Sequence, residues 1–324
     1  MYKELFHNIT FGERQSYGAV EALPIHTPVK KDPLAYLTLI EALEEGVLKI
    51  LEVSEGGSVP ELKAVNTGNL PILLISGEEV KGARQNRILN TSILLAAGTE
   101  LVIPVSCTER GRWHYESPDF KDSGNISSKD VRLATNISVR HSLDAEKTFR
   151  SDQGMVWATI EDLHHKSRSH ETSSTRAMDD AFKARANDLD GALRRFSPEP
   201  GQTGILFFHG GKVAGLDILS QPVAYARLHD KLVKSYVIDS LEMKEAHHTR
   251  ETLLVASEKF LASAVSGKEK VFPSPGLGED HRFTSPVVAG SSLIYSAEPI
   301  HTCAFGTKAE EQRMAGFSKR RDLW

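Results

Sequence analysis

The densest group of residues able to do chemistry follows an apolar stretch and begins at Gly77. The segment Gly-Glu-Glu-Val-Lys-Gly-Ala-Arg-Gln-Asn-Arg, which ends at Arg87, holds two carboxylates, three cations and two carboxamides. Such side chains recognise polar ligands through directional hydrogen bonds, and the glycines let a ligand approach the backbone. The candidates for general acid–base catalysis are Glu78 and Glu79, and those for binding a small-molecule ligand are Gln85, Asn86, Arg87 and Asn90.

The alternative interpretation of this segment is a solvated hairpin or an intramolecular polar network, which is the usual role of charge-rich segments. Asn90 and Ser92 weigh against simple solvation, because they lie inside an otherwise apolar run and need partners if they are buried. The sequence leaves ligand binding and internal pairing both open.

A second cluster, Pro104–Trp113, reads Pro-Val-Ser-Cys-Thr-Glu-Arg-Gly-Arg-Trp. Cys107, at the end of a predicted strand and followed by arginines, could be an activated thiol nucleophile. No histidine partner is evident, and a free cysteine is more often a small buried hydrophobe, so we expect Cys107 to be structural. Arg112 and Trp113 are candidates for ligand binding, because guanidinium and indole faces suit phosphate, carboxylate or a nucleobase. Structural stacking of the pair is the alternative.

Histidines give weaker signals. His209 precedes Gly210-Gly211, and a glycine-rich turn beside a histidine can hold an anion, so His209 joins the binding candidates, with a plain hairpin as the alternative. The pair His164-His165 does not form a two-ligand face, because adjacent side chains point in different directions on a helix. His170 and nearby acidic residues could add ligands, but we expect no metal site, and the sequence indicates no particular cofactor.

Apolar and β-branched runs predict the elements that position these residues. A proline-initiated helix is predicted from Asp32 to Gly46, and Tyr115–Ser128 is predicted to be a surface loop. Strands are predicted at Val47–Val53, Leu62–Val65, Leu70–Ser76, Ile88–Ala96 and Glu100–Ser106, the second and third joined as a hairpin by a tight polar turn.

The second half of the chain is predicted to be helical first and mixed afterwards. A helical segment covers 143–197, with a Ser/Thr-rich break at Ser167–Thr175. A hairpin around His209, helices after Pro222 and over Thr249–Val265, and further strands to Phe305 follow. Strands and helices group in blocks without regular alternation, which favours an α+β fold with mostly antiparallel sheet regions in the N-terminal and C-terminal parts.

We therefore predict one large α+β unit over 1–306 (sheet-rich 1–142, helical 143–197, α+β 198–306) and a charged C-terminal tail over 307–324. The net charge of −4 argues against nucleic-acid binding, and no apolar run is long enough to cross a membrane. The N-terminus does not resemble a signal peptide, and two cysteines are too few for a disulfide framework, so a cytoplasmic location is expected. A homo-oligomer is left open.

The order Gly77-Glu78-Glu79, Gly82, Gln85-Asn86-Arg87 and then Pro104 to Trp113 resembles the hallmark of a poorly characterised family, the ADP-ribosylglycohydrolase- and rhodanese-phosphatase-associated protein domain family. The similar organisation extends over most of the chain. The resemblance implies a link to NAD or ADP-ribose metabolism by association, and it implies no established mechanism.

Two functions follow from these observations. The first is a small-molecule enzyme, a hydrolase or transferase, acting on a nucleotide- or ADP-ribose-like substrate through the residues named above. The second is a non-catalytic ligand-binding or scaffold module in which the same cluster senses a metabolite or stabilises the sheet.

Overall fold

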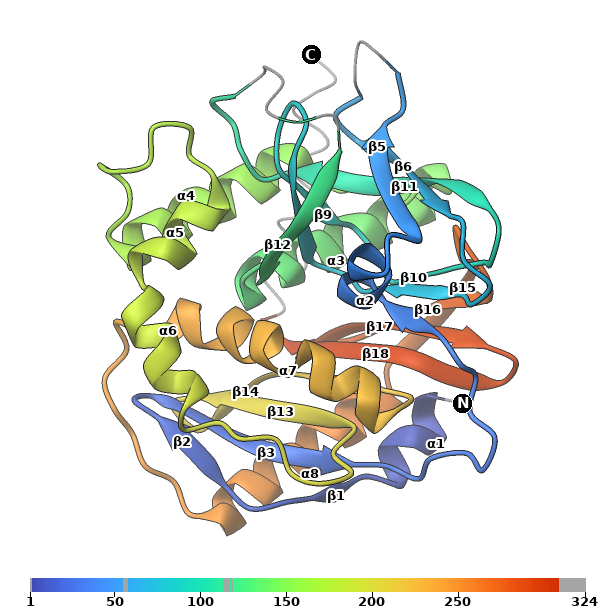
Figure 1. The fold of residues 1–324 in the computed structure, drawn as a ribbon. Coiled ribbons are helices and arrows are strands. Elements are labelled where there is room, and N and C mark those ends of the chain that lie inside the picture. The colour runs from blue at the N-terminus through green and yellow to red at the C-terminus, as the bar shows by residue number, and fades with distance from the viewer. Residues whose placement is uncertain (1, 55–57, 113–116, 118, 309–324) are drawn as a thin grey trace. The chain divides into compact units, whose positions relative to one another are not determined.

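The computed structural model describes residues 2–54, 58–112, 117 and 119–308. It falls into two compact units whose segments alternate along the chain (Figure 1). Unit 1 comprises Met1–Pro33, Arg185–Pro273 and Gly278–Gln312, and unit 2 comprises Leu34–Ala184, Ser274–Leu277 and Arg313–Trp324. Helices and mostly antiparallel strands make up both units, so the predicted α+β class is confirmed. The single unit predicted over 1–306 stays a prediction, and most of the predicted tail lies outside the described residues.

Unit 1 is built on a nine-stranded antiparallel sheet. Its strand order is β1 (Thr10–Phe11), β3 (Val20–His26), β13 (Gly204–His209), β14 (Lys212–Leu219), β18 (Glu298–Gly306), β17 (Val288–Tyr295), β16 (Glu279–Ser285) and β15 (Lys268–Pro273), and β2 (Gln15–Tyr17) pairs with β3. The hairpin predicted around His209 is confirmed by the pairing of β13 with β14. Gly210 and Gly211 both have positive φ there, which glycine adopts without a steric penalty.

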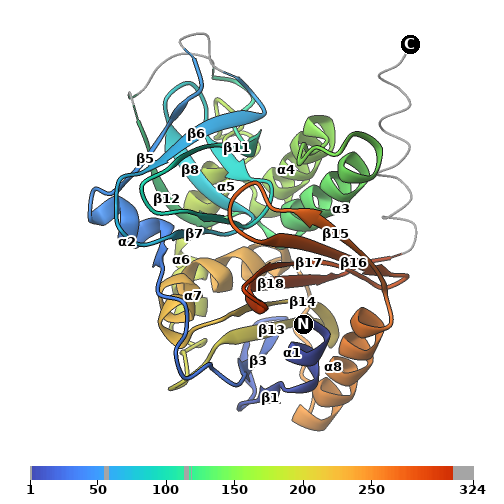
Figure 2. The same ribbon diagram turned by 90° about the vertical axis from the view of Figure 1, so that its right-hand side faces the viewer.

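The helices of unit 1 are α1 (Tyr2–His7), α6 (Ala186–Leu193), α7 (Pro222–Val237), the 3-10 helix η1 (Ile238–Ser240) and α8 (Arg250–Val265). Figures 1 and 2 show α7 along one face of the sheet and α8 along the other. Alternation along β13 explains both contacts: Phe207 stacks on Tyr236 of α7, whereas Leu206 and Phe208 share a core with Leu253 of α8.

Unit 2 contains two sheets. The larger has the order β12 (Phe120–Ile126), β8 (Glu78–Gly82), β9 (Arg87–Leu89), β11 (Glu100–Cys107), β6 (Glu61–Asn66) and β5 (Leu48–Glu52). The smaller has the order β10 (Ile93–Leu95), β7 (Ile72–Leu74) and β4 (Leu37–Thr38), and β4 and β7 are parallel. Strand β11 pairs with β6 along its first part and with β9 along its last three residues. The end of β11 therefore brings Cys107 directly opposite Arg87.

The helices of unit 2 are α2 (Leu39–Glu44), α3 (Lys129–Glu146), α4 (Gln153–Ser167) and α5 (Met178–Ala184). Helices α3 and α4 lie side by side (Figure 2). Asp152 caps the N-terminus of helix α4 with a side chain that accepts a hydrogen bond from the Met155 amide, and Arg168 caps the C-terminus in the left-handed conformation. Apolar side chains of α2 and both sheets, such as Leu39, form a common core.

Two predicted elements of unit 2 are wrong in extent. The helix predicted from Asp32 begins only at Leu39, because Thr38 and Glu41 form a capping box there. The predicted loop Tyr115–Ser128 contains strand β12, whose Phe120 and Ile126 are buried. The polar residues between these two, together with a register irregularity in the pairing with β8, conceal the strand pattern.

The predicted hairpin Leu62–Val65 and Leu70–Ser76 is also wrong. Strand β6 pairs with β5 and β11, whereas β7 pairs with β10 and β4 in the other sheet. The Asn66 side chain explains the separation, because it donates hydrogen bonds to the Leu70 and Ala96 carbonyls at 2.9 and 3.0 Å and turns the chain out of the first sheet.

No helix in the described part of the chain is both long enough and apolar enough to cross a membrane.

Candidate functional site

The predicted site residues of unit 2 lie on adjacent strands and are buried. Glu78 and Glu79 begin β8, Arg87 begins β9, and Gln85 and Asn86 occupy the turn between these strands. All of them, together with Asn90 and Arg112, are among the buried polar residues. The structure thus brings these seven residues into one unit. Because they are buried, their polar groups need hydrogen-bond partners, either within the protein or in a ligand.

Arg112 and Glu109 form the centre of a hydrogen-bonded network in this region. The Arg112 guanidinium contacts Glu109 Oε2 at 2.7 Å, and it donates to the Ala83 carbonyl at 2.8 Å and to Asn86 Oδ1 at 3.2 Å. Glu109 Oε2 also accepts the Asn86 amide at 3.2 Å. The planar donors of Arg112 therefore hold the turn between β8 and β9 against the segment that follows β11.

Gln85 extends this network to Cys107 and Arg87. Its side-chain amide donates to the Glu109 carbonyl at 2.8 Å, and its Oε1 accepts from Arg87 Nη1 and from the Cys107 thiol, both at 3.2 Å. Arg87 is fully buried, and its Nε and Nη2 have no hydrogen-bond partner among the described residues. Burial lowers the pKa of Arg87, which the nearby Cys107 and Glu52 oppose.

Cys107 has the environment of a structural thiol. Its side chain is 0 % exposed, and burial raises its pKa, although the Arg87 guanidinium and the Glu109 amide favour the thiolate. A buried thiol of raised pKa is a poor nucleophile. Cys107 instead fixes helix α4 through its backbone, which exchanges two hydrogen bonds with the Gln153 side-chain amide at 2.8 and 2.9 Å.

The two candidate acid–base residues have different surroundings. Glu78 Oε2 accepts the Ile75 amide at 2.9 Å. Glu79 Oε1 accepts from the Thr108 hydroxyl at 2.7 Å, and its Oε2 has no hydrogen-bond partner among the described residues. Burial and the charge of Asp179 raise the pKa of Glu79 to about 8. Glu79 is therefore largely protonated at neutral pH.

Of the remaining predicted residues, Asn90 and His209 form hydrogen bonds outside the network around Arg112. The Asn90 side chain donates to the Phe149 carbonyl at 3.0 Å and accepts from Ser106 at 2.5 Å. His209 belongs to unit 1, where it lies 2.9 Å from the Tyr236 carbonyl. Trp113 lies outside the described residues.

The buried network ends at a pair of antiparallel backbone segments, Thr108–Gly111 and Thr175–Met178. The Gly111 amide donates to the Thr175 carbonyl at 2.8 Å, and the Met178 amide donates to the Thr108 carbonyl at 2.9 Å. Gly111 is required by this approach, because a Cβ atom there would lie 2.8 Å from Thr175 Cα. Arg110 and Arg176 each lie within one of the paired segments.

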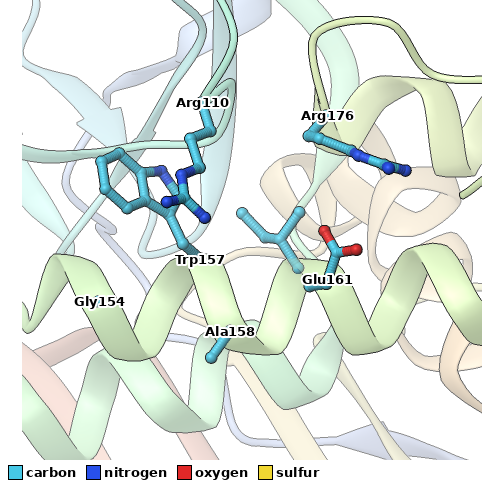
Figure 3. A pocket seen from close by; sticks show the side chains of 7 residues that line it. Arg110, Gly154, Trp157, Ala158, Glu161 and Arg176 are labelled. Atoms are coloured by element: carbon cyan, nitrogen blue, oxygen red, sulfur yellow. The ribbon is translucent and has the colours of Figure 1, made fainter.

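Arg110 and Arg176 line a pocket of about 510 Å³ whose floor is helix α4 (Figure 3). The Arg110 guanidinium lies over the Trp157 ring, 5.3 Å from its centroid, and Arg176 extends beside Glu161. Among the described residues, Arg110 makes no salt bridge with a carboxylate. Arg176 has a positive φ of 55°, an unfavourable conformation for arginine, and it donates to the His170 carbonyl. The volume is that of a small-molecule pocket.

The sequence patterns did not single out this pocket. Arg110 lies within the second cluster without a predicted role of its own, and Trp157 lies in the segment 143–197 that is predicted to be helical. One available signal was the spacing of Trp157 and Glu161, which places both on one face of a helix. The position of Arg176 near Arg110 depends on the pairing of Thr108–Gly111 with Thr175–Met178, which no sequence pattern predicts.

The family comparison covers nearly all of the described chain. A family model described as the ARG and Rhodanese-Phosphatase-superfamily-associated Protein domain, ARPP-1, matches residues 8–305. The chain belongs to the ARPP-1 family. The resemblance noted from Gly77 to Trp113 is thereby confirmed. The match includes most of both units of this ARPP-1 domain, so neither unit by itself corresponds to the family. A search of curated proteins and a search of solved structures gave no match.

Proposed function

We propose that unit 2 of this ARPP-1 domain binds a small anionic molecule of the nucleotide class, with ADP-ribose as the first candidate. The observation that carries the proposal is the Arg110–Trp157 pair in the pocket opposite Arg176. An indole face suits a nucleobase, and two guanidinium groups suit a pyrophosphate, because each offers several donors in one plane. The ARG of the family name stands for ADP-ribosylglycohydrolase, and this association supports ADP-ribose within the nucleotide class.

The buried network has a positioning role in this proposal. Glu109 and Arg112 flank Arg110 in the sequence and are fixed to the turn containing Asn86. Gln85 is bonded to the same segment. These contacts restrict the backbone on which Arg110 is carried, and a restricted binding residue loses less conformational entropy when a ligand binds.

A catalytic version of the proposal is a hydrolase or transferase acting on the same ligand. The pKa of Glu79, raised to about 8, suits an acid–base group at neutral pH. Its carboxyl group is 0 % exposed, however, and the residues lining the pocket include Glu161 but neither Glu78 nor Glu79. Binding is therefore better supported than catalysis by Glu79, and a non-catalytic ligand-binding module is the second candidate.

The direct test is calorimetric titration of the full chain with ADP-ribose, ADP, NAD and ribose 5-phosphate in the presence of a chelator. We expect ADP-ribose or ADP to bind, and Arg110→Ala to weaken binding by about tenfold or more, the effect of losing a charged hydrogen bond. Arg176→Gln should weaken binding similarly. The same mixtures, incubated and separated by chromatography, would reveal any turnover.

Arg195→Ala is the matched control, because Arg195 is exposed and belongs to unit 1. It should leave the affinity unchanged. Absence of binding for all four compounds, or equal binding by wild type and both pocket variants, would reject the proposal. Thermal melting without ligand should be nearly the same for wild type, Arg110→Ala and Arg195→Ala, since both arginines are exposed, and it serves as the folding check for Arg176→Gln, whose side chain donates to the His170 carbonyl.

A further inference from the structure

A mixed cluster of metal-ligating side chains lies at the edge of the pocket. Glu161 and His165 are one turn apart on helix α4, and His170 follows the end of that helix. The ligand atoms of all three lie within 4.8 Å of one another. Glu161 Oε1 is 2.8 Å from His170 Nε2 and 3.8 Å from His165 Nε2.

We infer that Glu161, His165 and His170 form a binding site for one divalent transition-metal ion such as Zn²⁺. Imidazole nitrogens and a carboxylate oxygen coordinate zinc at roughly 2.0–2.2 Å. Two such ligands at a tetrahedral angle are then about 3.3 Å apart, a value that follows from these bond lengths. The distance from Glu161 Oε1 to His170 Nε2, 2.8 Å, is shorter than this value, and the distance to His165 Nε2, 3.8 Å, is longer.

The local backbone holds the third ligand next to the other two. Arg168 caps the C-terminus of helix α4 in the left-handed conformation, after which the Ser169 amide donates to the His164 carbonyl at 3.0 Å. His164 Nδ1 also lies 2.6 Å from Ser169 Oγ. The turn is thus fixed by buried polar contacts immediately before His170. His164 therefore stabilises this turn, whereas His165, its neighbour in the sequence, lies beside Glu161 and His170.

Metal binding would require a small change in the two imidazole rings. The rings of His165 and His170 are stacked, with centroids 4.4 Å apart and planes inclined by 18°. A metal ion lies in the plane of each imidazole that binds it, so at least one ring must turn. The His165 side chain is 61 % exposed and can change its rotamer at little cost. This movement distinguishes coordination from the ordinary pairing of His170 with Glu161.

Three protein ligands leave coordination positions for water or another molecule, as in catalytic rather than structural zinc sites. Glu161 also lines the pocket with Arg110 and Arg176. An ion held by Glu161 would add positive charge beside these arginines and favour an anionic ligand. The metal site itself does not rest on the proposed nucleotide binding, since its ligands are complete without a bound molecule.

The test is titration of the chelator-treated full chain with Zn²⁺ by calorimetry and with Co²⁺ by visible absorption. We expect one ion per chain and a Co²⁺ spectrum of low-symmetry coordination. Separate substitutions Glu161→Gln, His165→Gln and His170→Gln should each weaken binding by about tenfold or more, because loss of a residue that only orients a metal ligand already costs about that much. His247→Gln, an exposed histidine in unit 1, is the control and should bind like the wild type.

The outcomes separate this inference from the proposed function. Zn²⁺ binding lost in the three variants but retained in the control supports the site even if no nucleotide binds. Absence of Zn²⁺ binding, or binding unaffected by all three substitutions, overturns the inference even if ADP-ribose binds in the presence of chelator. Thermal melting of each metal-free variant serves as the folding check, and His165→Gln is the most informative variant because its exposed ring contributes least to packing.

Discussion

The network around Arg112 and the pocket around Arg110 use the same kinds of side chain in opposite ways. Arg112 is 6 % exposed and is bonded to Glu109, Asn86 and two backbone carbonyls. Arg110, two residues earlier, is exposed and lies over Trp157. A buried charge needs its partners for stability, whereas an exposed charge is available to a ligand. A sequence segment rich in polar residues therefore does not show which of them line a pocket and which of them form buried hydrogen bonds that hold the pocket in place.

The largest effect that tests this comparison is expected for Arg112→Ala. Its removal leaves the Glu109 carboxylate buried without its cation, and the free energy of unfolding should fall by about 5 kcal/mol, the upper end for breaking a buried pair. Urea unfolding followed by circular dichroism measures this loss.

Arg112→Lys, which keeps the charge but loses the planar donor geometry, should lie between wild type and Arg112→Ala. Arg110→Ala should change the stability by less than about 0.5 kcal/mol, as is usual at exposed positions. If Arg112→Ala keeps full stability and loses only ligand binding, the distinction between the network and the pocket fails.

Glu79 gives the next effect, which depends on pH. Its pKa of about 8 in the folded state exceeds the ordinary 4.5, so the folded chain holds an additional proton between these values. Stability from this proton is fully present below pH 4.5 and is lost as the pH rises toward and through 8, by roughly 5 kcal/mol over the whole range. Unfolding measured at several pH values should show this decline.

Glu79→Gln is the control for the pH effect, because it mimics the protonated acid and does not titrate. The difference in stability between wild type and Glu79→Gln should widen in favour of the variant from pH 5 to pH 8. A difference that stays constant over this range would mean that Glu79 remains ionised in the folded chain, and would weaken the argument that it is an acid–base candidate.

Gly111→Ala should have a smaller effect on stability than Arg112→Ala or the titration of Glu79, and it should also alter the pocket. The added Cβ would approach Thr175 Cα to 2.8 Å, so the two paired segments must separate. We expect a loss of about 1–3 kcal/mol, typical of overpacking, together with weaker nucleotide binding as Arg110 and Arg176 move.

Gly154→Ala offers the same substitution as a control for stability alone, because the new Cβ would meet only the Asp152 side chain, at 3.3 Å, although Gly154 lines the pocket. In the first turn of helix α4 it should be neutral or slightly stabilising. Stability unchanged by Gly111→Ala would contradict the close pairing of the two segments.

The fold could be predicted from the sequence where the signal was local. The strand Val47–Val53 corresponds to β5, and the hairpin at His209 depends on glycines next to each other in the chain. The loop predicted at Tyr115–Ser128 was wrong because β12 is stabilised by its pairing with β8 rather than by its own composition.

The candidate site shows the same limit. The polar residues from Glu78 to Arg87 could be identified from their density, but whether they bind a ligand or one another depends on burial, which density does not reveal. The pocket is formed by residues from α4 and from two loops that are far apart in the sequence, Arg110 and Arg176 among them. Such non-local pairings have no periodic pattern in a single sequence.

The alternation of the two units along the chain has a consequence for biosynthesis. Unit 2 is largely one continuous segment, Leu34–Ala184, and can collapse as soon as it leaves the ribosome. Strand β3 of unit 1 is synthesised earlier, but it can pair with β13 only after residue 204 has been synthesised, because Gly204 pairs with Ile25. Until then the backbone N–H and C=O groups along this edge of β3 are unpaired, and they can form hydrogen bonds with strands of other chains. We expect nascent chains to be most vulnerable to aggregation after unit 2 has folded and before β13 has been synthesised.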